Sequence, residues 1–129
     1  MKLAREQAIE NHRKMWNWIA DETLKRKRAL HKKEYFSANN IPDSIRPVCD
    51  CYCCEYSTIN FRRNCSVCPI QWNHRLCYVS EYDNWRKACY AENYKKAANL
   101  ARTIANLPEN EHIANVGKKI AKKEQDNDL

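Results

Sequence analysis

The segment from Cys49 to Cys68, CDCYCCEYSTINFRRNCSVC, contains six of the eight cysteines of a 129-residue chain that has only one glycine. Cysteines at this density are typical of a disulfide framework, a metal site or a reactive thiol. The first residues, MKLAREQAIENHRK, lack the apolar core of about 7–15 residues that a secretory signal needs. We therefore expect a cytoplasmic protein, in which disulfides rarely persist and the cysteines are available to a metal.

The spacing of the cysteines favours zinc. Two CxxC pairs, Cys51 with Cys54 and Cys65 with Cys68, are separated by ten residues, a spacing typical of zinc ribbons and related fingers. Each pair lets two thiolates converge on one tetrahedral ion, and four sulfurs leave no open position for water. The sequence therefore predicts a structural Zn²⁺ site.

Further candidate ligands leave the ligand set open. Cys53 could form a shifted pair with Cys49, and Cys77 with His74 could replace either member of the first pair. Another set combines the second CxxC pair with Cys77 and one upstream cysteine. A second zinc ion held by these additional residues is a further alternative, and iron can substitute for zinc in a four-sulfur site.

Other uses of the cysteines have less support. A redox CxxC pair belongs at the start of a helix that follows a strand, and the sequence lacks that α/β pattern. A catalytic cysteine with His74 as its partner conflicts with a thiol already bound to a metal. Cys89 lies on an apolar helical stripe, so we expect it to be a small buried hydrophobe. The sequence contains no P-loop, HExxH or GxSxG motif, and we expect no enzymatic activity.

The rest of the chain predicts a mainly α fold in a single domain, residues 1–129. The scarcity of glycine leaves little material for β-turns, and Ala, Glu, Lys, Arg and Leu dominate both ends. Apolar residues at helical spacing predict one long helix over residues 3–36 and a second, antiparallel to it, over residues 80–107, which begins near Ser80 and ends before Pro108. No segment has the roughly 20 consecutive apolar residues of a membrane span, so we expect no membrane partner.

Residues 37–79, between the two long helices, show no sustained helical period and hold seven of the eight cysteines. A segment with so little continuous apolar material needs another source of order, and a structural metal is the usual one. The predicted fold is therefore two long helices joined by a zinc-knuckle insert. A short helix is predicted over 109–124, followed by a frayed polar tail at 125–129.

The net charge of +7 predicts attraction to phosphate or to an acidic protein surface. The basic residues gather late in the first helix and inside the insert, at Lys25, Arg26, Lys27, Arg28, Arg62 and Arg63. An equally good account of the first group is a solvated helix end whose positive charges meet the helix dipole.

Aromatic residues at helical spacing are most often core, and we expect Trp16 and Trp85 to be buried. Trp18 does not share the stripe of Trp16 and Ile19. It is therefore either covered by another part of the chain or exposed for a partner, and it is the first candidate for an interface aromatic.

Four segments, HRKMWNWIADET, CCEY, CPIQW and YDNWRKA, resemble small cysteine-rich proteins encoded by phages and prophages of Gram-positive bacteria. The resemblance spans most of the chain and implies a protein acting in the cytoplasm of an infected bacterial host cell. Some small neighbours in that group, including zinc-containing anti-CRISPR proteins, inhibit host defences.

From that resemblance we expect a zinc-stabilised inhibitor that binds a bacterial defence effector, a Cas9-type nuclease in the leading hypothesis, and blocks it stoichiometrically. The rival hypothesis is a zinc-finger nucleic-acid-binding phage regulator. A third is a structural component whose zinc insert joins it to other phage proteins.

Overall fold

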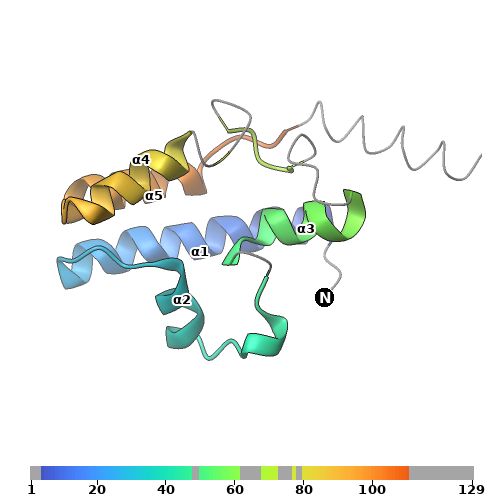
Figure 1. Ribbon diagram of the computed structural model, residues 1–129, viewed down its shortest axis with the longest axis horizontal. Helices are drawn as coiled ribbons and strands as arrows, with labels where there is room; N and C mark the ends of the chain where they lie inside the picture. Colours follow the sequence, from blue (N-terminus) through green and yellow to red (C-terminus); the bar gives the residue numbers. More distant parts are fainter. Residues whose placement is uncertain (1–3, 48–49, 62–67, 73–76, 78–79, 111–129) are drawn as a thin grey trace, which may run out of the picture.

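The computed structural model describes residues 4–47, 50–61, 68–72, 77 and 80–110. Most of these residues are helical, so the prediction of a mainly α fold is confirmed. The helices are α1 (Arg5–Arg26), α2 (Lys32–Ala38), α3 (Tyr52–Phe61), α4 (Glu81–Tyr90) and α5 (Tyr94–Ala105), with the short 3-10 helix η1 (Asp43–Ile45) between α2 and α3 (Figure 1). The one contact of strand type among the described residues is an isolated antiparallel bridge between Ile70 and Glu109.

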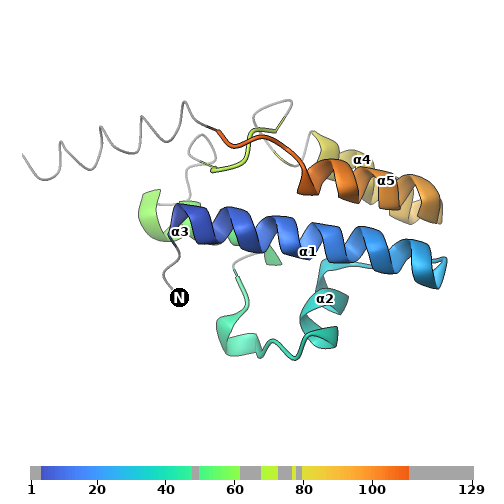
Figure 2. The same ribbon diagram turned by 180° about the vertical axis from the view of Figure 1, so that it is seen from behind.

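The longest helix, α1, is the centre of the arrangement. The pair α4 and α5 lies on one side of it, and α2 with η1 lies on the other (Figures 1 and 2). Arg102 of α5 donates hydrogen bonds to Asn17 at 2.6 Å and to the Asp21 carboxylate, which ties α5 to α1 at the surface. Four of the five buried residues of α5 are alanines, whose small side chains let the two helices approach closely.

The prediction of a single helix over 3–36 is wrong, because α1 ends at Arg26. Lys27 takes the left-handed conformation, with φ 56° and ψ 38°, and reverses the chain. The returning segment is then fixed by Leu30, which is fully buried and donates its N–H to Thr23 Oγ1 at 3.4 Å. A second, separate helix, α2, begins at Lys32.

The prediction of one helix over 80–107 is wrong in the same way. α4 and α5 form a helical hairpin that turns at Glu92, whose φ is 57°. Asn93 stabilises the turn from both sides. Its N–H donates to the Ala88 carbonyl at 3.0 Å, and its side-chain oxygen accepts the Lys96 N–H at 3.2 Å as the N-cap of α5.

The insert, residues 37–79, contains a ten-residue helix, α3, that the lack of a helical period did not predict. Beyond α5 the chain is extended at Pro108–Asn110, where the short helix predicted over 109–124 should begin. Gln71 donates to the Pro108 carbonyl and Asn110 to the Pro69 carbonyl, both at 2.9 Å, so the insert pairs with this segment. The rest of that predicted helix and the tail at 125–129 lie outside the described residues.

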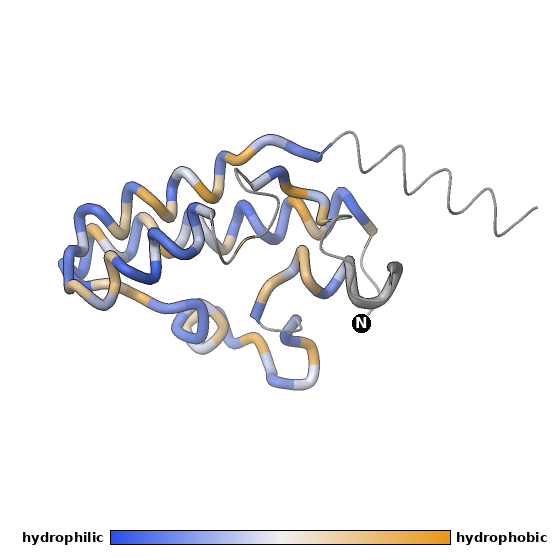
Figure 3. Tube along the Cα trace, turned by 45° about the horizontal axis from the view of Figure 1, so that its top comes forward, coloured by the Kyte–Doolittle hydropathy of each residue, from blue (hydrophilic) through white to orange (hydrophobic). Residues whose placement is uncertain are grey.

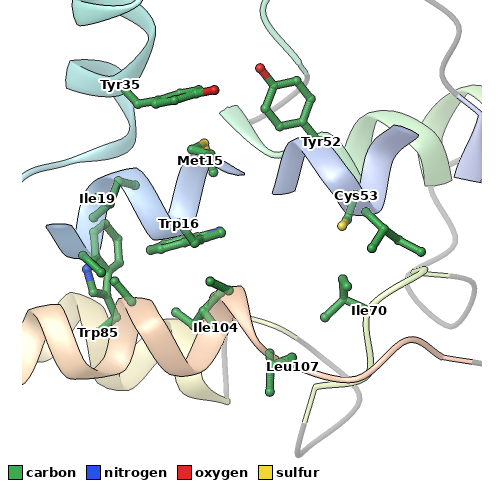
Figure 4. Close-up of a cluster of buried hydrophobic side chains, with 14 of the residues drawn as sticks. Met15, Trp16, Ile19, Tyr35, Tyr52, Cys53, Ile70, Trp85, Ile104 and Leu107 are labelled. Carbon is green, nitrogen blue, oxygen red and sulfur yellow. The ribbon is translucent and has the colours of Figure 1, made fainter. Parts of the chain in front are cut away.

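The core is built around Trp16 of α1 (Figure 4). Trp16 and Trp85 are only 2% and 3% exposed, which confirms both as core residues. Their rings meet edge to face at 4.8 Å between centroids, a favoured aromatic geometry, and Tyr82 adds a second edge contact at 6.1 Å. Cys53 and Ile70 lie at the opposite end of this core from Trp85, so the insert is packed onto α1 as well as onto the chain after α5.

Candidate functional site

Five cysteines from three segments lie close together beside α1. Cys51 precedes α3, Cys53 and Cys54 lie in its first turn, and Cys68 and Cys77 come from the chain that follows. Cys53 is fully buried, whereas the others are partly exposed. Cys53 is part of the main core, and Cys51, Cys68 and Cys77 pack against it while keeping some contact with solvent.

Two of these sulfurs are held in an environment that favours the thiolate. The backbone N–H of Cys54 donates to Cys51 Sγ at 3.4 Å. Hydrogen bonds from the Cys53 and Cys54 side chains hold the pKa of Cys51 well below its ordinary value, assisted by the charge of Lys32. A hydrogen bond from Cys53 likewise lowers the pKa of Cys68. Thiolates are the form in which cysteines bind metals.

The two donor cysteines are shifted in the opposite direction. Burial raises the pKa of Cys53 well above its ordinary value, and the hydrogen bonds to Cys51 and Cys68 raise it further. The hydrogen bond to Cys51 is the main cause that raises the pKa of Cys54, which also feels the charges of Cys77 and Cys68. Within the group, hydrogen bonds therefore lower the pKa of Cys51 and Cys68 and raise the pKa of Cys53 and Cys54.

Three of the four predicted zinc ligands, Cys51, Cys54 and Cys68, thus belong to one group of thiols, and the fourth, Cys65, lies outside the described residues. The alternates Cys53 and Cys77 belong to the same group. The remaining alternates, Cys49 and His74, also fall outside the description. Within the residues that the structure describes, no three Cys, His, Asp or Glu side chains form a group that could hold a metal ion.

Sequence reasoning did not single out His12 as a functional residue, although its spacing from Ile9 and Trp16 placed it on the buried face of α1. Its side chain is 1% exposed, and Nε2 lies 3.1 Å from the Ile104 carbonyl oxygen. Nδ1 is buried without a hydrogen-bond partner among the described residues. Burial lowers the pKa of His12, against the opposing effects of Cys51 and Ile104. The ring is therefore neutral, with Nε2–H donating to the carbonyl.

Stability is expected to fall on acidification because of His12. In the folded protein the buried His12 binds a proton less readily than in the unfolded chain, where its pKa has the ordinary value of 6.5. The contribution of neutral His12 to the free energy of unfolding is complete above pH 6.5. It is lost as the pH falls from 6.5 toward the lower pKa of the folded state, and the loss is at most about 1.4 kcal/mol per pH unit.

The measurement is urea unfolding of the wild type and of His12→Gln at about pH 7.5, 6.5 and 5.5. Glutamine keeps an N–H donor for the Ile104 carbonyl but does not titrate. The free energy of unfolding of the wild type should fall more steeply below pH 6.5 than that of the variant. Parallel pH profiles would show that His12 is not the group responsible.

A groove of about 880 Å³ lies between α4 and the chain that reverses into α2. Its lining includes Trp85, whose ring centroid is 6.2 Å from that of His31, and Tyr82, whose ring centroid is 4.8 Å from the Lys32 Nζ. Burial alone would lower the pKa of Lys32, but Cys51 and Tyr82 raise it above its ordinary value. Lys32 therefore carries its charge between the groove and the thiol group.

A smaller hollow of about 370 Å³ adjoins the groove and shares His31, Cys89 and Glu92 with it. Cys89 is only half-buried, in place of the full burial that its apolar stripe predicted. Burial nevertheless raises its pKa to about 11. It lines both cavities as a neutral thiol.

The predicted partner-binding cations are divided by the fold. Lys27 and Arg28 line the smaller hollow, and Lys25 and Arg26 lie exposed in the last turn of α1. The hydrophilic residues at that end of the molecule appear in blue in Figure 3. The other two predicted cations, Arg62 and Arg63, lie outside the described residues.

Of the two arrangements expected for Trp18, covered by the chain or exposed for a partner, the structure shows the first. The Trp18 ring packs against Tyr35 of α2 with a centroid distance of 5.5 Å, and it is partly buried against the core. Only part of the ring is left for a partner, and its role in binding stays a prediction. Among the described residues the most exposed large apolar side chain is Tyr90, at 80%. Helical spacing alone did not separate it from the aromatics that are buried.

The chain matches no protein-family model, and no curated protein and no solved structure is significantly similar to it. In the part of the chain that the structure describes, no helix has the length and apolar character needed to cross a membrane.

Proposed function

We propose that the protein is a zinc-stabilised helical protein that acts by binding another macromolecule and has no chemistry of its own. The observation that carries the zinc part of the proposal is the contact among the thiols of Cys51, Cys53, Cys54 and Cys68, which two segments of the insert bring together beside α1. Thiolates in contact with one another are costly unless protons or a cation neutralise them, and Zn²⁺ is the cation that such ligands prefer.

The proposed ligands are Cys51, Cys54, Cys65 and Cys68, with Cys53 and Cys77 as replacements from the same group. The Cys54 N–H that donates to Cys51 Sγ would also support that sulfur as a ligand, since hydrogen bonds orient metal ligands and tune their charge. A site closed by four sulfurs holds the metal tightly and excludes substrate, so the ion would serve the fold alone.

The proposed partner is a bacterial defence effector of the Cas9 type, which the sequence resemblance implies and the charge distribution supports. Lys25 and Lys27 are exposed where α1 ends and form no ion pair with a described residue. Positive charges of this kind steer a protein toward an acidic or RNA-bearing surface and increase the association rate.

The test is cleavage of target DNA by a panel of Cas9-type nucleases, with guide, in the presence of an equimolar amount of the zinc-loaded protein. We expect at least one nuclease to be inhibited, and we expect Lys25→Glu with Lys27→Glu to weaken that inhibition about tenfold at physiological salt. The control is Lys14→Glu, a change at an exposed position in the middle of α1. Cleavage that is unaffected throughout the panel would overturn this choice of partner.

A second candidate function, a nucleic-acid-binding regulator, is favoured by the same unpaired cations. Duplex binding by such a regulator should weaken steeply with salt, because each phosphate contact releases counterions. The absence of salt-dependent duplex binding would argue against it, and a salt slope unchanged by the Lys25 and Lys27 substitutions would place the contact elsewhere on the protein.

A further inference from the structure

We propose that the groove between α4 and the reversed chain at Lys27–Glu34 binds a short segment of single-stranded nucleic acid, with phosphates on its unpaired cations and a base stacked on Tyr90. This inference depends neither on the zinc site nor on the identity of the effector. It rests on the charges and rings that the chain reversal after α1 brings against α4.

The groove carries an excess of positive charge because most of its acidic residues are already neutralised. The Glu34 carboxylate pairs with Arg28 at 3.0 Å. The Asp50 carboxylate pairs with Arg46, also at 3.0 Å.

Among the described residues that line the groove and the hollow, Glu92 is the one carboxylate without an ion pair. Lys33 and Arg86 line the groove, Lys27 lines the adjoining hollow, and none of the three has an ion-pair partner among the described residues. Lys32 adds a further charge over the Tyr82 ring. Cations spaced along a groove in this way are suited to a chain of phosphates.

Tyr90 adds an exposed aromatic ring to the groove, and a surface that bound anions by charge alone would not need one. The Tyr90 ring is 80% exposed at the C-terminal end of α4, although α4 has a buried face available to aromatics, as Trp85 shows. An exposed ring beside phosphate-binding cations is the arrangement on which unpaired bases stack in sequence-tolerant single-strand binding.

Single strands fit these observations better than the other anionic partners. In a duplex the bases are stacked on one another and cannot reach Tyr90, so only the phosphates would be recognised. An acidic peptide would use the cations and leave the ring without a role. Phosphates and stacked bases are common to RNA and DNA, so both kinds of single strand are expected to bind.

The experiment measures fluorescence anisotropy of labelled oligouridylate and oligothymidylate of about twelve nucleotides with the full chain. Tyr90→Ala should weaken binding about tenfold, whereas Tyr90→Phe should bind as the wild type does. Lys33→Ala and Arg86→Ala should each weaken binding and reduce the slope of log K against log salt by about 0.7. Lys14→Ala, a matched loss of one exposed charge on the order of 20 Å along α1 from the chain reversal, should change neither.

Three results would overturn the proposal: unchanged affinity in Tyr90→Ala, equal effects of Lys14→Ala and Lys33→Ala, or tighter binding of a duplex of the same sequence. If polyglutamate displaced the oligonucleotide completely, and Tyr90→Ala weakened the binding of polyglutamate as much as that of the oligonucleotide, the groove would instead be assigned to an acidic protein. Binding is measured before and after chelation. Retention after the metal is removed would separate this inference from the zinc proposal, and binding without nuclease inhibition would separate it from the proposed partner.

Discussion

Replacing Trp16 by alanine is expected to lower the free energy of unfolding by about 3–5 kcal/mol, a large part of the 5–15 kcal/mol that usually stabilises a domain. The ring is 2% exposed and lies at the centre of the core. It contacts Trp85 and Tyr82 edge to face, and it also lies 6.5 Å from the His12 ring. The substitution therefore removes the contact surface of both α1 and α4 and leaves a cavity that neither can fill.

The matched control is Trp18→Ala on the same helix. Trp18 is partly exposed and contacts Tyr35 at the edge of the core. Its loss should cost about 1–2 kcal/mol, because part of the ring is already in water. Urea unfolding followed by far-ultraviolet circular dichroism gives both values at one fixed zinc concentration. Equal losses for the two variants would mean that the centre of the core is not at Trp16.

Removing the proposed zinc ion is expected to have the second large effect, the loss of the insert while α1, α4 and α5 remain folded. Structural zinc contributes an apparent 10–16 kcal/mol, on the order of the values for zinc-finger peptides, and much of this is folding free energy. Cys53 lies in the same core as Trp16 but at the opposite end from Trp85 (Figure 4), so the packing of α1 against α4 and α5 should outlast the order at Cys51–Cys54. Acid should act as a chelator does, because protons compete with zinc for thiolates.

Elemental analysis before and after a strong chelator, with hydrogen exchange of the insert and circular dichroism of the helices, follows the two parts separately. Cys51→Ser should lose zinc and protection of the insert, whereas Cys89→Ser should keep both, since Cys89 lies by the groove and outside the thiol group. Simultaneous loss of the insert and the helical signal would contradict independent folding of the two parts. A purified protein without metal would contradict the zinc site.

The sequence predicted the core of the fold but not where its helices end. The burial of Trp16 and Trp85 was predicted from the helical spacing of neighbouring residues, and that spacing does not depend on where each helix ends. Both helix ends that were missed lie at residues with positive φ, Lys27 and Glu92, where the sequence has no glycine. Lysine and glutamate are good helix formers and rarely take that conformation, so only tertiary contacts, such as the burial of Leu30, select it.

The candidate sites divide along the same line. The CxxC spacing predicted that Cys51 and Cys54 would be neighbours, because three residues within one turn fix that geometry. Cys68 and Cys77 come close to Cys51 and Cys54 because the insert packs against α1, and the spacing of cysteines in the sequence carries no information on that packing. The groove was not foreseen either, since it exists only because the chain reverses at Lys27 and brings Lys33 to α4.

The bridge between Ile70 and Glu109 connects two segments that are remote in sequence, so a movement of one segment is coupled to the other. Ile70 lies two residues after Cys68, and Glu109 lies in the chain that leaves α5. Whatever fixes the thiol group therefore also fixes the direction in which the chain departs from the helical body. By reciprocity, the factor by which a metal at the proposed zinc site would change the affinity of a partner for Pro108–Asn110 is also the factor by which that partner would change the affinity for the metal.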